Sequence, residues 1–370
     1  MDATRRDLIL QRWNVIQHEL MPELRHDCGA LTPKLEKLVH ILDWVRIEEW
    51  TQAWLGIGRK PHERGALANA FVAKAVLNLA TTRAVIERLS MDRALKRLCG
   101  FPMWKAVPDE ATFSRAFAQF TQARLPERVH EAMVKTYLGD QLIGHISRDG
   151  TAIEAREKAA KKVATEAPVK VKGAKARRGR PRKDEALPAK INKISRQRSQ
   201  SLPAMLEELP RACDRGTKCN AQGYKNSWTG YKLHIDTADC GVPVSALLTS
   251  ASVHDSQTAV PLATMTAARV TNLYDLMDAA YCSVELQEHS RGLGHVPLID
   301  HNPRGGAKDQ FEPADAVRYR ERTQAERTNG RLKDEFGGRS VRVRGPDKVM
   351  THLMFGLLVL TADQLMRLLT

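Results

Sequence analysis

A long basic stretch without aromatic residues interrupts the chain between residues 155 and 200. It contains 16 Lys and Arg against 4 Asp and Glu, and no Phe, Trp or Tyr. Such a segment cannot bury enough apolar surface to offset the conformational entropy lost on ordering. We therefore predict a basic, disordered insert over about 155–220, with the folded parts of the chain on either side of it.

The whole chain is also basic, and this charge limits the partners that it favours. Its 58 Lys and Arg against 43 Asp and Glu give a formal charge of +15, which attracts nucleic acid or an anionic membrane. The strongest apolar run, Leu353–Leu360, is far shorter than a bilayer span. The N-terminus has no long apolar segment of a secretory signal. We therefore expect nucleic acid as the partner, with no membrane.

The cysteines indicate the compartment. Six are scattered through the chain without CxxC spacing. Free thiols of this kind are typical of a reducing cytoplasm. The localisation expected from the sequence is therefore cytoplasmic.

The insert contains one short motif. Arg178-Gly179-Arg180-Pro181 matches the core of an AT-hook, in which Arg178 and Arg180 would lie in a narrow A·T minor groove. The alternative is a generic basic linker that contacts phosphates without base selectivity. Because the match covers only four residues of low complexity, it favours this simpler interpretation.

Residues 1–138 are expected to be helical. Apolar residues recur with a period near 3.6 over Leu67–Leu89, and Pro108-Asp109-Glu110 is typical of a helix start. Two interpretations remain equal: a helix-turn-helix that reads DNA, or a helical bundle for packing or dimerisation.

Residues 139–350 are expected to form an α/β catalytic domain that contains the insert. Strand-like runs end at Asp149 and Asp278, two more follow residue 228, and helical and strand patterns alternate up to 299. This order predicts a ribonuclease H-like mixed sheet flanked by helices. A C-terminal helix is expected over 349–370.

The polar helix before Gly337 presents an unusual face. At 100° per residue, Tyr319, Arg322, Glu326 and Lys333 fall within about 60° of one another. Because Arg322 and Glu326 are four residues apart, a plain surface salt bridge is the alternative interpretation.

The spacing of these four residues, Tyr-x2-Arg-x3-Glu-x6-Lys, resembles the YREK signature of bacterial insertion-sequence transposases of the DDE class. The segments around Asp149 and Asp278 look like the first and second aspartate segments of that class. These two segments are Arg148–Lys158 and Leu276–Tyr281, and two further similar segments between them are Trp228–His234 and His254–Ser256. Gly150 stands where Ser or Thr often follows the first aspartate, and Cys282 stands where Asp is common, but neither departure removes an expected metal ligand.

The resemblance implies an activity and a metal. Asp149, Asp278 and Glu326 would hold two Mg²⁺ ions, with Mn²⁺ as the expected substitute, because carboxylates suit a hard cation and two ions neutralise the charge on the attacking and leaving oxygens. The enzyme would cleave the ends of an insertion sequence and join them to target DNA.

The same resemblance implies how DNA is held. Arg322 and Lys333 would bind phosphates near the cut, and Tyr319 would contact the transposon end. The double-stranded DNA partners would be the terminal inverted repeats and the target. The protein would act as a homodimer on DNA and associate with the nucleoid.

Two other functions stay open. One is a domesticated nuclease that cuts DNA without joining it, and the other is a catalytically silent DNA-binding repressor. The intact Asp149, Asp278 and Glu326 argue against the repressor. Two further acids are expected to be structural: Asp255 as an ordinary helix cap and Asp275 on the opposite face of its strand.

Overall fold

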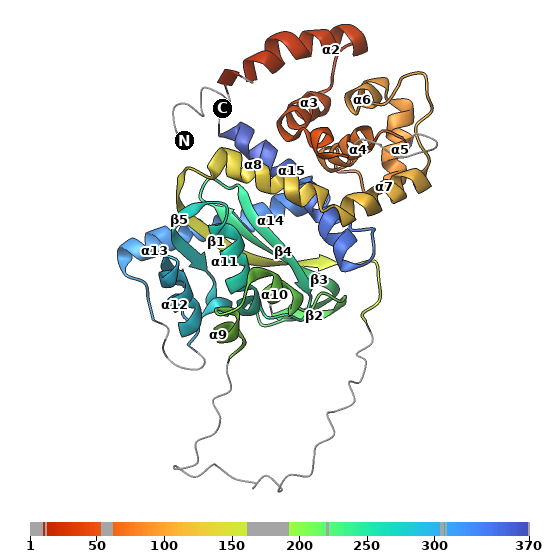
Figure 1. Cartoon of the computed structure of the whole chain (residues 1–370). Helices are drawn as coiled ribbons and strands as arrows, with labels where there is room; N and C mark the ends of the chain where they lie inside the picture. Colours follow the sequence, from red (N-terminus) through yellow and green to blue (C-terminus); the bar gives the residue numbers. More distant parts are fainter. Residues whose placement is uncertain are drawn as a thin grey trace, which may run out of the picture.

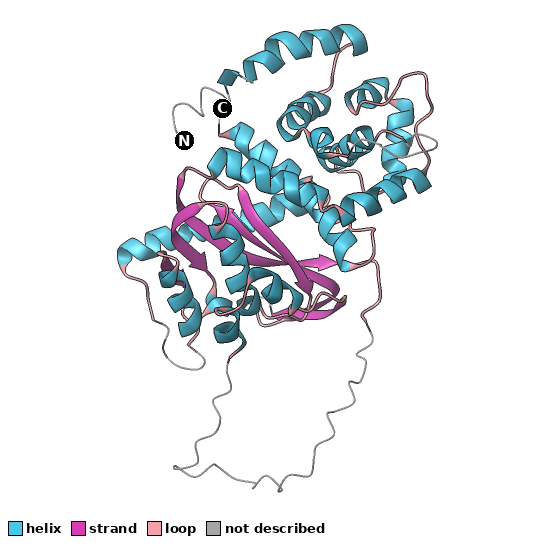
Figure 2. Ribbon diagram, in the orientation of Figure 1, coloured by secondary structure: helices cyan, strands magenta, loops and turns pink. Residues whose placement is uncertain are grey.

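A computed structural model gives the protein a mixed β-sheet flanked by helices, with a helical region before it (Figures 1 and 2). This agrees with the predicted fold class. The middle of the predicted insert, including Arg178 and Arg180, lies outside the residues that the structure describes. Those residues are 10–11, 13–52, 62–160, 192–219, 222–303, 307 and 309–368.

The sheet is built around β1 and β3, which pair antiparallel over nine residues. β1 also pairs parallel with β5, and β5 pairs parallel with β6. β3 pairs antiparallel with both β2 and β4. The strands are β1 (Leu142–Glu154), β2 (Asp214–Cys219), β3 (Lys225–Ala238), β4 (Pro243–Ser250), β5 (Thr271–Met277) and β6 (Val296–Ile299).

The N-terminal region is helical, as predicted. The single apolar pattern over 67–89 corresponds to two helices, because α4 ends at Val76 and Thr81 caps α5. Asp109 caps α7, as the sequence indicates. The elements are η1 (Ile16–Leu20), α2 (Met21–Cys28), α3 (Pro33–Val45), η2 (Ile47–Trp50), α4 (Arg64–Val76), α5 (Thr82–Met91), α6 (Arg93–Leu98), α7 (Glu110–Gln122) and α8 (Leu125–Leu138).

The C-terminal part of the predicted insert is ordered, which corrects that prediction. α9 (Lys193–Gln197) and α10 (Leu202–Glu207) precede β2. Ile194 and Met205 are buried in a cluster with residues of α11 (Ala259–Ala267) and α12 (Val284–Gly292). These few apolar side chains supply the buried surface that the composition of the stretch as a whole lacks.

α15 (Pro346–Arg367) joins the two parts of the molecule. It contacts α3, α4, α7 and α8 of the N-terminal region, and also β4 and α14 (Thr323–Glu335) (Figure 1). It is long enough and apolar enough to cross a membrane, but 78% of its most apolar 18-residue stretch is buried inside the protein. Such burial is typical of a helix in the core of a folded domain.

Asp363 of α15 anchors this junction. It is 5% exposed and forms an ion pair of 2.6 Å with Lys37 of α3. Arg331, on the helix after the sheet, and Arg367 pair with the same carboxylate. Burial opposes ionisation, but the hydrogen bonds from Lys37 and Arg331 hold the pKa of Asp363 below its usual value.

We predict that Asp363→Asn lowers the free energy of unfolding by about 3 kcal/mol at pH 7, because the buried carboxylate that three cations share is replaced by a neutral amide. Since the pKa of Asp363 is lower in the folded state, its contribution is present above pH 3.8, the ordinary value, and is lost as the pH falls further. Urea unfolding at several pH values measures both effects.

Asp347→Asn is the matched control on the same helix. Asp347 pairs with Arg211 at 2.7 Å, but its side chain is 67% exposed. A change below about 1 kcal/mol is expected for such a pair. Equal losses in the two variants would contradict the anchoring role of Asp363.

Candidate active site

Asp149 and Asp278 lie side by side at the point where the pairing of β1 with β5 ends. β1 itself continues to Glu154 through its pairing with β3, so the expectation that this strand ends at Asp149 was wrong. β1 and β5 are parallel neighbours, and their register pairs Arg148 with Met277. The next residues are Asp149 and Asp278, both half-buried. Asp278 caps the short turn η4 (Ala279–Tyr281), where it accepts a 2.9 Å hydrogen bond from the backbone N–H of Ala280. The parallel topology therefore brings together two residues that are distant in sequence.

Burial and like charge disfavour ionisation of this pair. Burial raises the pKa of Asp149 to about 6, and the negative charge of Asp278 adds to the effect. Burial also raises the pKa of Asp278. Lys218 and Arg322 act in the opposite direction on both aspartates. Clustered carboxylates with raised pKa values form a site where a bound cation relieves repulsion.

The segment with Tyr319, Arg322, Glu326 and Lys333 is not one continuous α-helix, contrary to expectation. It consists of α13 (Pro313–Tyr319), a 3₁₀ turn η5 (Arg320–Arg322) and α14 (Thr323–Glu335). The turn packs on the sheet: the Ser147 hydroxyl lies 3.5 Å from the Glu321 carbonyl, to which it donates. At this contact the backbone of η5 winds more tightly than the 100° per residue of an α-helix.

The expected pairing within this segment is nevertheless present. Arg322 donates to Glu326 at 2.6 Å, and its guanidinium carbon lies 5.9 Å from the Tyr319 ring centroid. The Glu326 side chain is 54% exposed and that of Arg322 only 20%. Lys333 is half-buried, and the charge of Asp149 acts on its pKa against the lowering effect of burial. The Arg322–Glu326 salt bridge, which the sequence analysis gave as an alternative interpretation, is thus present beside the two aspartates.

Asn329 is a site residue that the sequence reasoning missed. Its Nδ2 donates a 2.9 Å hydrogen bond to Oδ2 of Asp149, and the residue is 6% exposed. It lies three residues after Glu326 and four before Lys333, so it continues the same stripe of α14. That spacing was readable in the sequence, but a neutral amide carries no obvious signal for this chemistry.

Asp255 also belongs to this region, which corrects its interpretation as an ordinary cap. His254 caps η3 (Asp255–Thr258) instead, because its Nδ1 accepts from the Ser256 N–H at 3.4 Å. Asp255 pairs with Lys232 at 2.8 Å, and a Cβ at Gly150 would lie 3.0 Å from its Oδ1. The absence of a side chain at Gly150 therefore leaves room for a third carboxylate near Asp149.

A buried ion pair stands directly behind Asp149. Arg148 is 2% exposed and donates to both oxygens of Asp236 at 2.8 and 2.7 Å. Asp236 also accepts from Thr266 of α11 at 2.7 Å. The paired charges and the added hydrogen bond satisfy groups that would be costly to bury alone. Asp275 is buried as well and contacts His295 at 3.1 Å, which agrees with its expected structural place.

The donor chemistry of Asp149 and Asp278 suits a hard divalent cation. Within the described part of the chain, no three His, Cys, Asp or Glu side chains gather closely enough to hold a metal as they stand. The carboxylate of Glu326 is paired with Arg322. The buried Oδ1 of Asn329 has no hydrogen-bond partner among the described residues.

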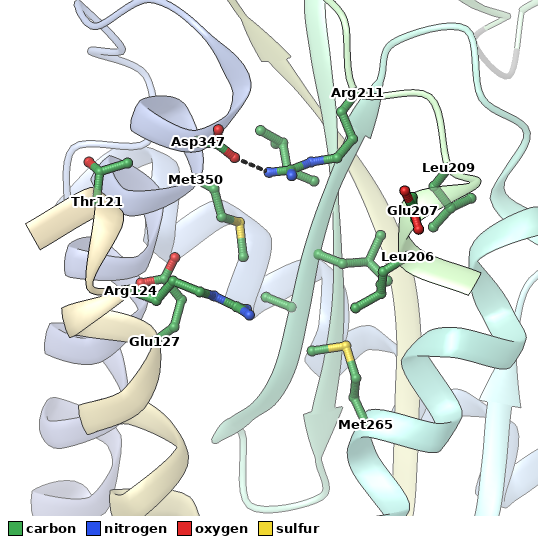
Figure 3. A pocket seen from close by; sticks show the side chains of 13 residues that line it. Thr121, Arg124, Glu127, Leu206, Glu207, Leu209, Arg211, Met265, Asp347 and Met350 are labelled. Atoms are coloured by element: carbon green, nitrogen blue, oxygen red, sulfur yellow. Dashed lines mark hydrogen bonds and ion pairs between the residues drawn. The ribbon is translucent and has the colours of Figure 1, made fainter. Parts of the chain in front are cut away.

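A separate cavity of about 430 Å³ lies between α8, α10, β4 and α15 (Figure 3). The Arg211–Asp347 ion pair crosses one side of it, at 2.7 Å (Figure 3). None of Asp149, Asp278 and Glu326 is among its lining residues. The acidic pair at the strand ends is therefore distinct from this cavity.

Two family models match the chain. The model described as "Transposase DDE domain" matches residues 209–362, and the one described as "Transposase domain (DUF772)" matches 17–119. The first range includes Asp278 and Glu326, whereas Asp149 precedes it and joins that region through the pairing of β1 with β3 and β5. The comparison with curated proteins gave no match.

We predict that Arg148→Met lowers the free energy of unfolding by roughly 3–5 kcal/mol, because Asp236 is left as an unpaired buried charge. The double variant Arg148→Met/Asp236→Leu is expected to recover most of that loss, since neither charge remains. Urea unfolding of the two single variants and the double variant measures the coupling. A double variant as unstable as the sum of the single variants would contradict a direct interaction.

Proposed function

We propose that this chain, whose two matched domains support a DDE-type insertion-sequence transposase acting on DNA, cleaves element ends and transfers them to target DNA. The observation that carries the proposal is the proximity of Asp149 and Asp278, which follow the last residue pair between the parallel strands β1 and β5, together with the hydrogen bond from α14 to Asp149. Two half-buried carboxylates of raised pKa favour divalent-cation chemistry.

In this proposal Asp149, Asp278 and Glu326 hold two Mg²⁺ ions, for which Mn²⁺ substitutes. The bound ions would supply charge neutralisation at the attacking and leaving oxygens of the phosphodiester. Glu326 would first leave Arg322 and turn toward the aspartates. Its side chain is 54% exposed, so such a change of rotamer needs little repacking.

The released Arg322 would then bind a phosphate of the DNA. A guanidinium offers a planar pair of donors for this contact, and Lys333 adds a second positive charge. Tyr319, whose ring lies beside Arg322, would contact the transposon end. The exchange of Glu326 for phosphate would couple DNA binding to completion of the metal site.

We further propose that the enzyme acts as a homodimer on DNA, because transposition brings two ends of an element together. The basic segment 161–191 would add contacts to DNA phosphates in the nucleoid, and Arg178 and Arg180 are its candidates for the minor groove. Cytoplasmic localisation follows from the location of bacterial DNA.

A nuclease that cuts DNA without joining it would use the same carboxylates. Only the reaction products therefore distinguish a nuclease from a transposase. We expect pre-cleaved element ends, incubated with Mg²⁺ and target DNA, to be joined covalently to the target. Denaturing gel electrophoresis measures the joined product. Cleavage of uncut ends without any joining would favour the nuclease, and DNA binding without cleavage would favour the repressor.

We predict that Glu326→Gln lowers the rate of strand cleavage by about 10³-fold, because several kcal/mol of transition-state stabilisation depend on the metal. DNA affinity should stay within a factor of a few, since no cationic contact is removed. Single-turnover cleavage and a mobility-shift titration measure the two quantities.

Glu321→Gln is the control, because Glu321 is an exposed carboxylate of the neighbouring turn. It should leave the cleavage rate near that of the unaltered protein. If Glu326→Gln cleaved DNA as fast as Glu321→Gln, the assignment of Glu326 would be wrong.

We predict that deletion of residues 161–191 flattens the salt dependence of DNA binding, because it removes eleven Lys and Arg against three acids. The ordered helices α9 and α10 are retained in this design. The slope of log affinity against log salt concentration is the measurement, and an unchanged slope would mean that these charges do not face DNA. Arg178→Ala/Arg180→Ala tests A·T preference separately.

A further inference from the structure

One hydrogen bond joins the helix that carries Glu326 to the strand that carries Asp149. Asn329 and Asp149 come from α14 and β1, which are far apart in sequence, and their side chains meet at 2.9 Å. Both residues lie away from bulk solvent, with Asn329 6% exposed and Asp149 half-buried. A hydrogen bond to a carboxylate in such surroundings is stronger and more directional than one at the surface.

The chemistry of the two groups fixes how this bond is oriented. An ionised carboxylate only accepts hydrogen bonds, so the amide must present its Nδ2 to Asp149. One oxygen of Asp149, Oδ2, is thereby engaged by the helix. This bond restricts the rotation of the carboxylate.

The remaining polar atom of the amide makes no hydrogen bond to the described part of the chain. Oδ1 of Asn329 is buried and has no hydrogen-bond partner among the described residues. A buried carbonyl without a partner costs about 1–3 kcal/mol, and such groups in native proteins call for an explanation. Retention of an amide here, at a cost to stability, favours a role for its donor beyond packing.

We propose that Asn329 is a positioning residue that orients the carboxylate of Asp149 for a divalent cation. This inference rests on the proposed function, in which Asp149 is a metal ligand. Asn329 acts through Asp149 and through its place one turn after Glu326. It thereby fixes the helix that brings Glu326 toward the two aspartates. Residues that orient metal ligands in this way commonly account for about 10- to 100-fold in metal affinity.

The chain offers a closely matched control in Asn272 at the start of β5. Its Nδ2 also donates to an aspartate, Asp275, at 3.2 Å, and its Oδ1 is also buried without a partner among the described residues. Asn272 is 2% exposed. It lies at the opposite end of β5 from Asp278. Loss of a buried asparagine as such is therefore separable from loss of the bond to Asp149.

The test measures Mn²⁺ binding to the full chain by electron paramagnetic resonance of the free ion, with no DNA and no activity readout. Asn329→Leu keeps the approximate shape of the side chain and removes the donor. Asn329→Ser is the second variant, and it is scored if the leucine variant does not fold. Asn272→Leu is the control, and Asp149→Asn reports on the metal site itself.

We expect Asn329→Leu to raise the dissociation constant of Mn²⁺ by about 10- to 100-fold. Asn272→Leu should leave that constant within twofold of the unaltered protein. If Asp149→Asn weakens binding and the Asn329 variant does not, the positioning role is overturned while the proposed metal site stands. If Asp149→Asn binds Mn²⁺ as tightly as the unaltered protein, the metal assignment fails, and the inference fails with it.

Discussion

The buried ion pair between Arg148 and Asp236 is the interaction on which the arrangement of the site depends. Arg148 immediately precedes Asp149, and its guanidinium reaches Asp236 of β3 and the sulfur of Met277 in β5. Thr266 of α11 adds a bond to the same aspartate. Four elements thus meet behind the acidic edge. Such a pair contributes specificity more than net stability, because desolvation offsets much of its Coulomb energy.

Specificity matters here because the side chains of a strand alternate between faces. A slip of one residue between β1 and β5 would turn Asp149 away from Asp278 and expose the residues now buried. The Arg148–Asp236 pair penalises that slip, since it would leave two charges unpaired in the core. Structural and chemical requirements therefore act on adjacent residues of one strand.

The carboxylates and the cations around them form a balanced arrangement. Lys218 and Arg322 oppose the raised pKa of both aspartates, and Lys232 neutralises Asp255. Arg322 has two roles in this balance, because it also holds Glu326. In the protein alone, positive side chains thus stabilise part of the charge that the proposed metal ions would neutralise. DNA phosphates would compete for those same side chains.

Much of this arrangement was predictable from sequence where local pattern and chemistry coincide. The strand patterns leading to Asp149 and Asp278 predicted β1 and β5, and the order of elements predicted the mixed sheet. The end of β1 was misplaced, because its pairing with β3 extends the strand to Glu154. The placement of Asp255 was not predictable, since a helix-start aspartate looks like a cap until Lys232 is brought near it. The same holds for the turn at Arg320–Arg322, where contact with the sheet overrides the α-helical period. Composition misjudged residues 192–219, because a few buried side chains such as Ile194 and Met205 suffice to order them.

α15 has a consequence for when the fold is completed during synthesis. Every element that it contacts, from α3 to α14, precedes it in the sequence. The nascent chain therefore emerges with the apolar faces of α4 and α8 and one side of β4 still uncovered, and these close only after residues 346–367 leave the ribosome. The fold is therefore completed only after α15 has been synthesised. A truncated mRNA that lacks the codons for α15 would give a protein without its central packing helix.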